Sequence, residues 1–129
     1  MKLKAITKII FIGENGEKFF GEGPCRLLLL TEELGSLRKA AISLGMAYSK
    51  ALRIVNRAEA AMGCALTVRV IGGASGGGTR LTPRGRELCR SYEAYREACA
   101  AENRRLFRQF FPEPLCRGGQ AVVFLLECL

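Results

Sequence analysis

Two helix-forming segments separated by a break at Gly45 constrain the fold of this chain more than any other feature. Residues 37–44 form the first segment, with small and apolar residues on one face, at Ala40, Ala41 and Leu44. The second segment covers residues 47–62, where apolar residues recur at helical spacing, at Ala51, Leu52, Val55, Ala58 and Met62. Gly45 can adopt the left-handed backbone conformation of a tight turn. The pattern therefore predicts a helix-turn-helix.

A glycine-rich loop between two short strands follows these helices. Residues 65–71 predict a strand, residues 72–78 contain five glycines, and residues 79–81 predict a returning strand. A nucleotide-binding phosphate loop is one alternative, but it needs Gly-Lys-Ser/Thr where this chain has Gly78-Thr79-Arg80. A loop that only connects two strands is the other. We favour a wing whose backbone N–H groups and flanking arginines contact DNA phosphates.

The N-terminal segment predicts a β-hairpin that leads into a first helix. Residues 2–12 are rich in β-branched residues and predict a strand. Asn15-Gly16 predicts a type I′ turn, and a returning strand begins at Lys18. Pro24 can occupy the first turn of a helix that Gly35 ends.

Capping residues predict where the remaining helices begin. Ser36 is a suitable N-cap for the second helix, and Thr82-Pro83 begins a long helix that runs to about Phe111. Residues 120–129 are apolar enough for a final strand. The predicted fold is mainly α with a small β component, a winged helix-turn-helix in a single domain over residues 1–129. We expect a hairpin over residues 1–23 and a helix-turn-helix with its wing over residues 24–81. A C-terminal dimerisation helix over residues 82–111 and an extension over residues 112–129 should follow.

The positive charge of the chain is confined to its middle. Residues 36–90 contain ten basic residues and two acidic ones, whereas residues 1–35 and 91–129 are each neutral. Concentrated positive charge is typical of a polyanion-binding unit. A solvated basic face without a partner is the alternative that charge alone leaves open.

The predicted helix over residues 47–62 presents groups that can read DNA. If Val55 is at the centre of the buried face, Ser49, Lys50, Arg53 and Arg57 lie on the opposite side, with Tyr48 and Asn56 at its margins. Arginine and lysine donate to guanine edges and phosphates, and asparagine can pair with adenine. The predicted DNA contacts are Arg38, Tyr48, Ser49, Lys50, Arg53, Asn56, Arg57, Arg69, Gly76, Gly77 and Arg80.

The long helix carries a nearly heptad-spaced apolar seam, which Glu102 interrupts. A helix of about 30 residues is roughly 45 Å long, more than a domain of this size covers by itself. We therefore predict a dimer interface at Leu88, Tyr92, Tyr95, Cys99, Leu106 and Phe110. The alternative is that the N-terminal hairpin and the last strand cover this face within one chain.

The composition argues against an enzyme and against a membrane protein. The chain has no histidine and no aspartate, which removes the usual catalytic triads, and its six cysteines form no Cys-x-x-Cys pair. We expect no cofactor, no metal site and mostly buried free thiols. A thiol-based redox sensor is an alternative, with Cys89 as the candidate reactive group. Since no apolar run approaches the roughly 20 residues of a membrane span and no export signal is present, we expect a cytoplasmic protein.

Four motifs resemble a known family of regulators. They are Gly-Ser-Leu-Arg-Lys-Ala-Ala at residues 35–41, Leu-Gly-Met-Ala-Tyr at 44–48, the glycines of residues 72–78, and Leu-Thr-Pro-Arg-Gly at 81–85. Their order and spacing are similar to those in the N-terminal DNA-binding domain of the molybdate-dependent transcriptional regulators, the ModE family. The resemblance covers about residues 5–110. The chain is similar, more distantly, to the LysR-type helix-turn-helix.

The resemblance implies a sequence-specific, duplex DNA-binding transcriptional regulator, with molybdenum-related genes as candidate targets. It implies a homodimer joined through the long helix and the hairpin, and DNA contacts at Tyr48, Ser49, Lys50, Arg69 and the wing. The chain departs from the family at Leu52, where tryptophan is common, and after Phe111, where family members carry paired oxyanion-binding domains. We therefore expect no molybdate binding, and a separate sensor protein could supply a signal. A protein- or RNA-interaction module that uses the same basic block is the alternative function.

Overall fold

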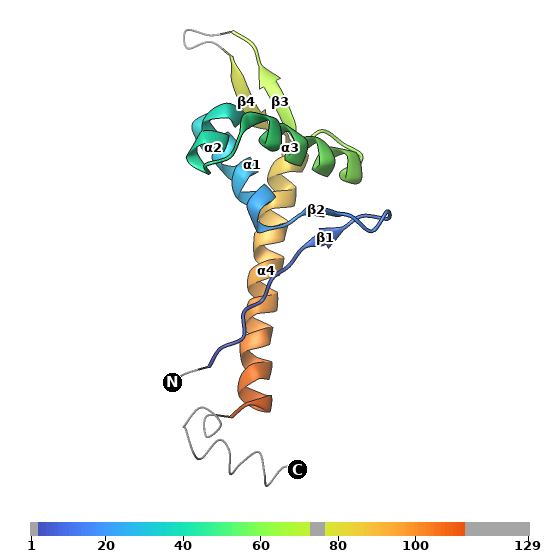
Figure 1. Ribbon diagram of the computed structural model, residues 1–129, viewed down its shortest axis with the longest axis vertical. Coiled ribbons are helices and arrows are strands. Elements are labelled where there is room, and N and C mark those ends of the chain that lie inside the picture. Colours follow the sequence, from blue (N-terminus) through green and yellow to red (C-terminus); the bar gives the residue numbers. More distant parts are fainter. Residues whose placement is uncertain (1–2, 73–76, 113–129) are drawn as a thin grey trace. The chain divides into compact units, whose positions relative to one another are not determined.

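The computed structural model describes residues 3–72 and 77–112, and the chain forms two compact units. One unit lies within residues 9–93, and the other combines residues 3–8 with residues 94–112, counting described residues alone. The elements in chain order are β1 (Phe11–Ile12), β2 (Lys18–Phe20), α1 (Glu22–Leu34), α2 (Leu37–Ser43), α3 (Tyr48–Met62), β3 (Thr67–Val70), β4 (Gly78–Leu81) and α4 (Pro83–Phe110). Figure 1 shows α1, α2 and α3 grouped beside the β3–β4 hairpin. This arrangement is a winged helix-turn-helix, as the sequence predicts.

Small residues allow α1, α2 and α3, in the unit over residues 9–93, to pack closely. Ala40 and Ala41 of α2 and Ala51 and Ala58 of α3 are fully or almost fully buried. Larger side chains fill the space around them, including Leu27 and Leu28 of α1, Val55 of α3, Leu66, Leu81 and Cys89. Since small side chains let helix axes approach, α2 and α3 pack closely against α1.

Local capping signals set the helix boundaries. Ser36 accepts a hydrogen bond from Lys39 N at 3.1 Å and caps α2, as expected. Gly45 has a φ of +69°, which the turn between α2 and α3 requires and which a residue with a Cβ rarely adopts. Thr82 Oγ1 accepts a hydrogen bond from Gly85 N at 3.0 Å and caps α4. These three predictions are confirmed.

The wing is an antiparallel hairpin fixed at its base. Thr67 pairs with Leu81 and Val70 pairs with Gly78, while residues 73–76 of the loop lie outside the described part of the chain. Thr79 N donates to Gly35 O at 3.0 Å, which attaches β4 to the end of α1. The start of β4 therefore has a fixed position against the helical core.

The predicted strand over residues 2–12 is largely wrong, since only Phe11 and Ile12 pair with β2. β2 has three residues and α1 begins at Glu22, so residues 3–10 have no partner strand among residues 3–72 and 77–112. A strand without a partner leaves its backbone groups unpaired. Ile9 O instead accepts a hydrogen bond from the Tyr92 hydroxyl at 2.7 Å.

The predicted type I′ turn is also wrong. Gly16 has a φ of +81°, but no described residue other than glycine has a positive φ, so Asn15 does not adopt the required conformation. Gly16 N donates to Gly13 O at 2.9 Å, and Asn15 Oδ1 accepts from Glu17 N. The hairpin thus uses a longer loop in which only the final glycine is left-handed.

The second unit combines residues 3–8 with residues 94–112 in the described part of the chain. Asn103 Nδ2 donates to Thr7 Oγ1 at 2.7 Å and to Ala5 O at 3.4 Å, so the N-terminal segment lies along this half of α4. The predicted final strand over residues 120–129 lies outside the described residues. No helix in the described ranges has the length and apolar character of a membrane span.

Candidate nucleic-acid interface

One face of α3 is exposed and basic. Ala51, Val55 and Ala58 point into the core, while the predicted contacts Ser49, Lys50, Arg53, Asn56 and Arg57 are all exposed. Leu52 and Met62, expected on the buried face, are exposed instead, because only a narrow stripe of α3 faces the other helices. Across residues 3–72 and 77–112, no ion pair involves Lys50, Arg53 or Arg57. These cations are therefore available to an anionic partner.

The only carboxylate of α3 is engaged elsewhere. Glu59 Oε2 accepts hydrogen bonds from Leu66 N at 2.8 Å and from Thr67 N at 3.2 Å, at the beginning of β3. Glu59 is thus held at the base of the wing. The positive charge of the exposed α3 face is not neutralised by this helix itself.

A cleft of about 400 Å³ brings together predicted contacts from three elements. Arg38 of α2 lies over the ring of Tyr48, with its guanidinium carbon 4.2 Å from the ring centroid. Arg69 of β3 lines the same cleft, as do Gly77 and Thr79 from the other side of the wing. A cation stacked on an aromatic face is held in place without losing its outward donors. This cleft can accept a phosphate group between the wing and the helix-turn-helix.

A larger groove of about 900 Å³ lies between α3 and the β1–β2 hairpin. Arg53, Asn56 and Arg57 line one side of it, and the hairpin loop contributes Glu14 and Glu17 to the other. The predicted contacts thus divide between this groove and the cleft beside the wing. Sequence reasoning missed the acidic hairpin loop as a neighbour of α3, because nothing in the local pattern places residues 13–18 beside residues 53–61.

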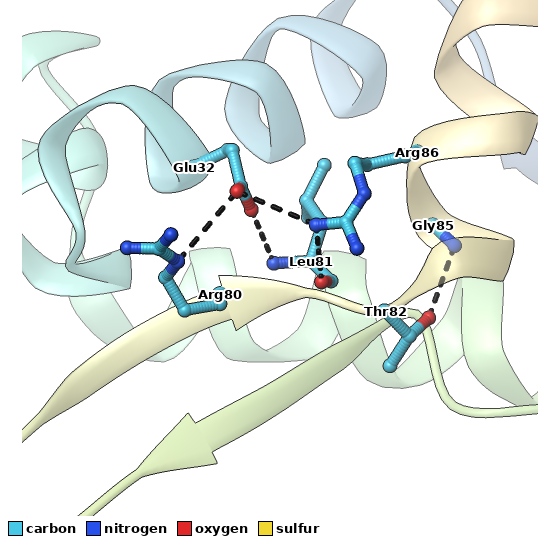
Figure 2. A network of polar contacts seen from close by, with 6 residues as sticks. All are labelled: Glu32, Arg80, Leu81, Thr82, Gly85 and Arg86. Carbon is cyan, nitrogen blue, oxygen red and sulfur yellow. Dashed lines mark hydrogen bonds and ion pairs between the residues drawn. The ribbon is translucent and has the colours of Figure 1, made fainter.

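Arg80 is not a free wing cation. Its Nε lies 3.6 Å from Oε1 of Glu32 in α1, and Figure 2 shows Arg80 and Arg86 approaching this carboxylate from opposite sides. Sequence reasoning missed Glu32. Glu32 follows the buried Leu28 by four residues, so it lies on the core-facing stripe of α1, where a carboxylate requires a partner. Gly76 lies outside the described residues.

The predicted dimer seam is partly covered by its own chain. Leu88 and Tyr92 are buried, and Tyr92 packs edge-on against Phe20 with ring centroids 5.2 Å apart. Little of either side chain is exposed to a partner helix, and the hairpin covers Tyr92, which is the part of the alternative expectation that falls on described residues. Tyr95, Leu106 and Phe110 remain 53%, 38% and 66% exposed, and Cys99 is half-buried.

Two ionisable groups in the part of α4 after Glu93 have local partners. A hydrogen bond with Cys99 raises the pKa of the Tyr95 phenol. Hydrogen bonds from Arg105 lower the pKa of the Glu102 carboxyl. The acidic residue that interrupts the seam is therefore an ionised group paired with Arg105.

The structure argues against Cys89 as a redox-active group. Cys89 is fully buried, and a hydrogen bond with Cys25, together with burial, raises the pKa of its thiol. Because the thiolate is the reactive form, this environment suppresses the chemistry that a sensor needs. The burial and the raised pKa of Cys89 therefore weigh against the redox-sensor alternative, in which Cys89 is the candidate reactive group. Within the described ranges, no cluster of three or more histidine, cysteine or acidic side chains could hold a metal ion.

Comparison with known families agrees with this geometry. Residues 25–86 match the family model of the bacterial regulatory helix-turn-helix proteins, lysR family. No curated protein matches the chain. The lysR-type match begins in α1, includes α2, α3 and the wing, and ends in the first turn of α4. It supports a LysR-like helix-turn-helix DNA-binding domain over these residues, and hence a DNA-binding transcription regulator.

Proposed function

We propose that this chain is a sequence-specific, duplex DNA-binding transcription regulator that acts as a homodimer. The observation that carries the proposal is the exposed face of α3, whose cations have no carboxylate partner in the described part of the chain. An α-helix fits the major groove, where arginine and asparagine side chains distinguish base pairs. The lysR-type match over the same residues supports this function.

We expect two arginines of the interface to act differently. Arg53→Ala should cost about 1–3 kcal/mol of affinity for a selected operator if Arg53 contacts a base. Arg69→Ala should weaken binding to all duplexes about equally and reduce the salt slope by about 1, because it contacts phosphate. Fluorescence anisotropy with the selected duplex and a scrambled one, over a range of salt concentrations, measures both effects.

Arg90→Ala is the matched control, since Arg90 is an exposed arginine of α4 outside the cleft and the groove. It should change the affinity less than either interface variant. If all three variants bind alike, the assigned interface is wrong. If the unmodified chain binds no duplex, the proposed function is wrong.

The homodimer is supported by the apolar side chains that remain exposed in the second half of α4. Leu106→Glu places a charge between Tyr95 and Phe110 on the exposed apolar face and should convert the dimer to a monomer. Ala101→Glu is the control, because it adds the same charge on the opposite face of the helix and should leave the dimer intact. Sedimentation velocity at micromolar concentrations measures both. A wild-type monomer, or a dimeric Leu106→Glu variant, would contradict this interface.

We further propose molybdenum-related genes as candidate targets. The support is the resemblance of about residues 5–110 to the DNA-binding domains of the ModE family. Residues 113–129 lie outside the described part of the chain and are not assigned an oxyanion site. A separate sensor protein is a candidate source of the signal, and sequencing of the bound DNA would identify the target genes.

A further inference from the structure

Glu32 connects α1 to the base of the wing. Its Oε2 accepts a hydrogen bond from Leu81 N, the last residue of β4, at 2.6 Å. Leu81 is itself buried, so this N–H needs an acceptor within the protein. Figure 2 shows the carboxylate between α1 and the strand, with Arg80 on one side and Arg86 on the other.

The two arginines share one carboxylate oxygen but are held unequally. Oε1 of Glu32 lies 3.4 Å from Arg86 Nη1 and 3.6 Å from Arg80 Nε. Arg86 Nη1 also donates to Leu81 O at 3.0 Å, so Arg86 has a second anchor. The side chain of Arg80 is 60% exposed, and within the described residues its Nε contacts Glu32 without a second anchor like the one that holds Arg86. Arg80 is therefore the partner that a competing anion can remove most easily.

We infer that Glu32 is a positioning residue that restrains Arg80 and thereby sets the sequence-independent part of DNA affinity. This inference rests on the proposed function. In the free protein, Glu32 offsets part of the charge of the wing cation. When DNA binds, backbone phosphates compete with Glu32 for Arg80, because phosphate and carboxylate use the same guanidinium donors. This competition weakens the contact of Arg80 with phosphate. Contacts of α3 with bases therefore contribute a larger share of the total affinity than they would if Arg80 were unrestrained.

Glu32→Gln separates the two interactions of the side chain. The amide oxygen of glutamine can still accept the hydrogen bond from Leu81 N, while the charge that holds Arg80 is lost. We expect about two- to five-fold tighter binding to a random-sequence duplex, the range that corresponds to an exposed ion pair. The salt slope should become steeper by up to about 1, because one more cation contacts phosphate. Fluorescence anisotropy over a range of salt concentrations measures both.

Glu33→Gln is the matched control. Glu33 is the next residue of α1 and is exposed, so its replacement gives the same change in net charge. It should alter binding less than Glu32→Gln does. In an Arg80→Gln background, the effect of Glu32→Gln should disappear, since the restrained cation is absent. Far-UV circular dichroism checks that each variant retains its fold.

Arg86→Gln addresses the same question with Glu32 in place. Of the two arginines, only Arg80 then remains to pair with Glu32, so Arg80 is restrained more strongly and binding to a random-sequence duplex should weaken. Arg84→Gln is the control, because Arg84 pairs with Glu87 and not with Glu32, and it should weaken this binding less.

If the unmodified chain binds no duplex, the proposed function and this inference both fail. This inference alone is wrong if the chain binds DNA but Glu32→Gln and Glu33→Gln change the affinity equally. It is also wrong if the effect of Glu32→Gln on the affinity persists in the Arg80→Gln background.

Discussion

Replacement of Gly85 by alanine is expected to destabilise the unit over residues 9–93 by about 3 kcal/mol or more. Gly85 lies in the first turn of α4, and a Cβ built there would be 2.2 Å from Leu66 O. The neighbouring atoms are backbone, so no rotamer change can relieve the clash. Leu66 O also accepts a hydrogen bond from Thr82 N at 3.0 Å, and Thr82 Oγ1 donates to Ala65 O at 2.8 Å. The helix and the segment before β3 must therefore separate.

Urea unfolding followed by circular dichroism measures the loss, and Gly23→Ala is the matched control. Gly23 lies near the start of α1, and nothing would be within 4 Å of a Cβ there. Alanine favours the helix, so this change should be neutral or stabilise by up to about 1 kcal/mol. A Gly85→Ala variant as stable as the unmodified chain would show that α4 does not contact the Leu66 backbone so closely.

Much of this fold could be predicted because its boundaries depend on local chemistry. Ser36 and Thr82 cap their helices through backbone N–H groups three residues away, and Gly45 acts through its own φ, so the sequence around each of them is sufficient to predict these boundaries. The exposed face of α3 is also a local property, since it follows from helical spacing in one segment. These features required no knowledge of what lies across the core.

The errors arise where the outcome depends on distant residues. Residues 3–10 have the composition of a strand, but a strand forms only if a partner is present, and β2 is too short to supply one. Apolar periodicity in α4 indicates that one face of the helix is buried. It does not indicate whether residues of the same chain or of a partner chain bury it. Tyr92 therefore looked like part of a dimer seam, although Phe11 and Phe20 of its own chain cover it. Glu32 was missed for the same reason, since its partners are about 50 residues away.

Truncation of Tyr92 to alanine is expected to cost about 3–5 kcal/mol of stability. Tyr92 is 1% exposed, and its ring meets Phe11 and Phe20 edge-on with centroids 5.4 and 5.2 Å away. Its hydroxyl donates to Ile9 O at 2.7 Å, which ties the chain before β1 to α4. The alanine variant would leave a cavity between the hairpin and the helix and would remove that hydrogen bond at the same time.

Tyr92→Phe separates the two contributions of this side chain. It keeps the ring and removes only the hydroxyl, so it should cost about 1 kcal/mol, the usual net value of one hydrogen bond. Ile42→Ala truncates an exposed apolar side chain of α2 and should change stability by no more than about 0.5 kcal/mol. Urea unfolding of the three variants at one protein concentration gives the comparison. If Tyr92→Ala costs no more than Tyr92→Phe, the ring is not part of the core and the face of α4 at Tyr92 is open to a partner chain.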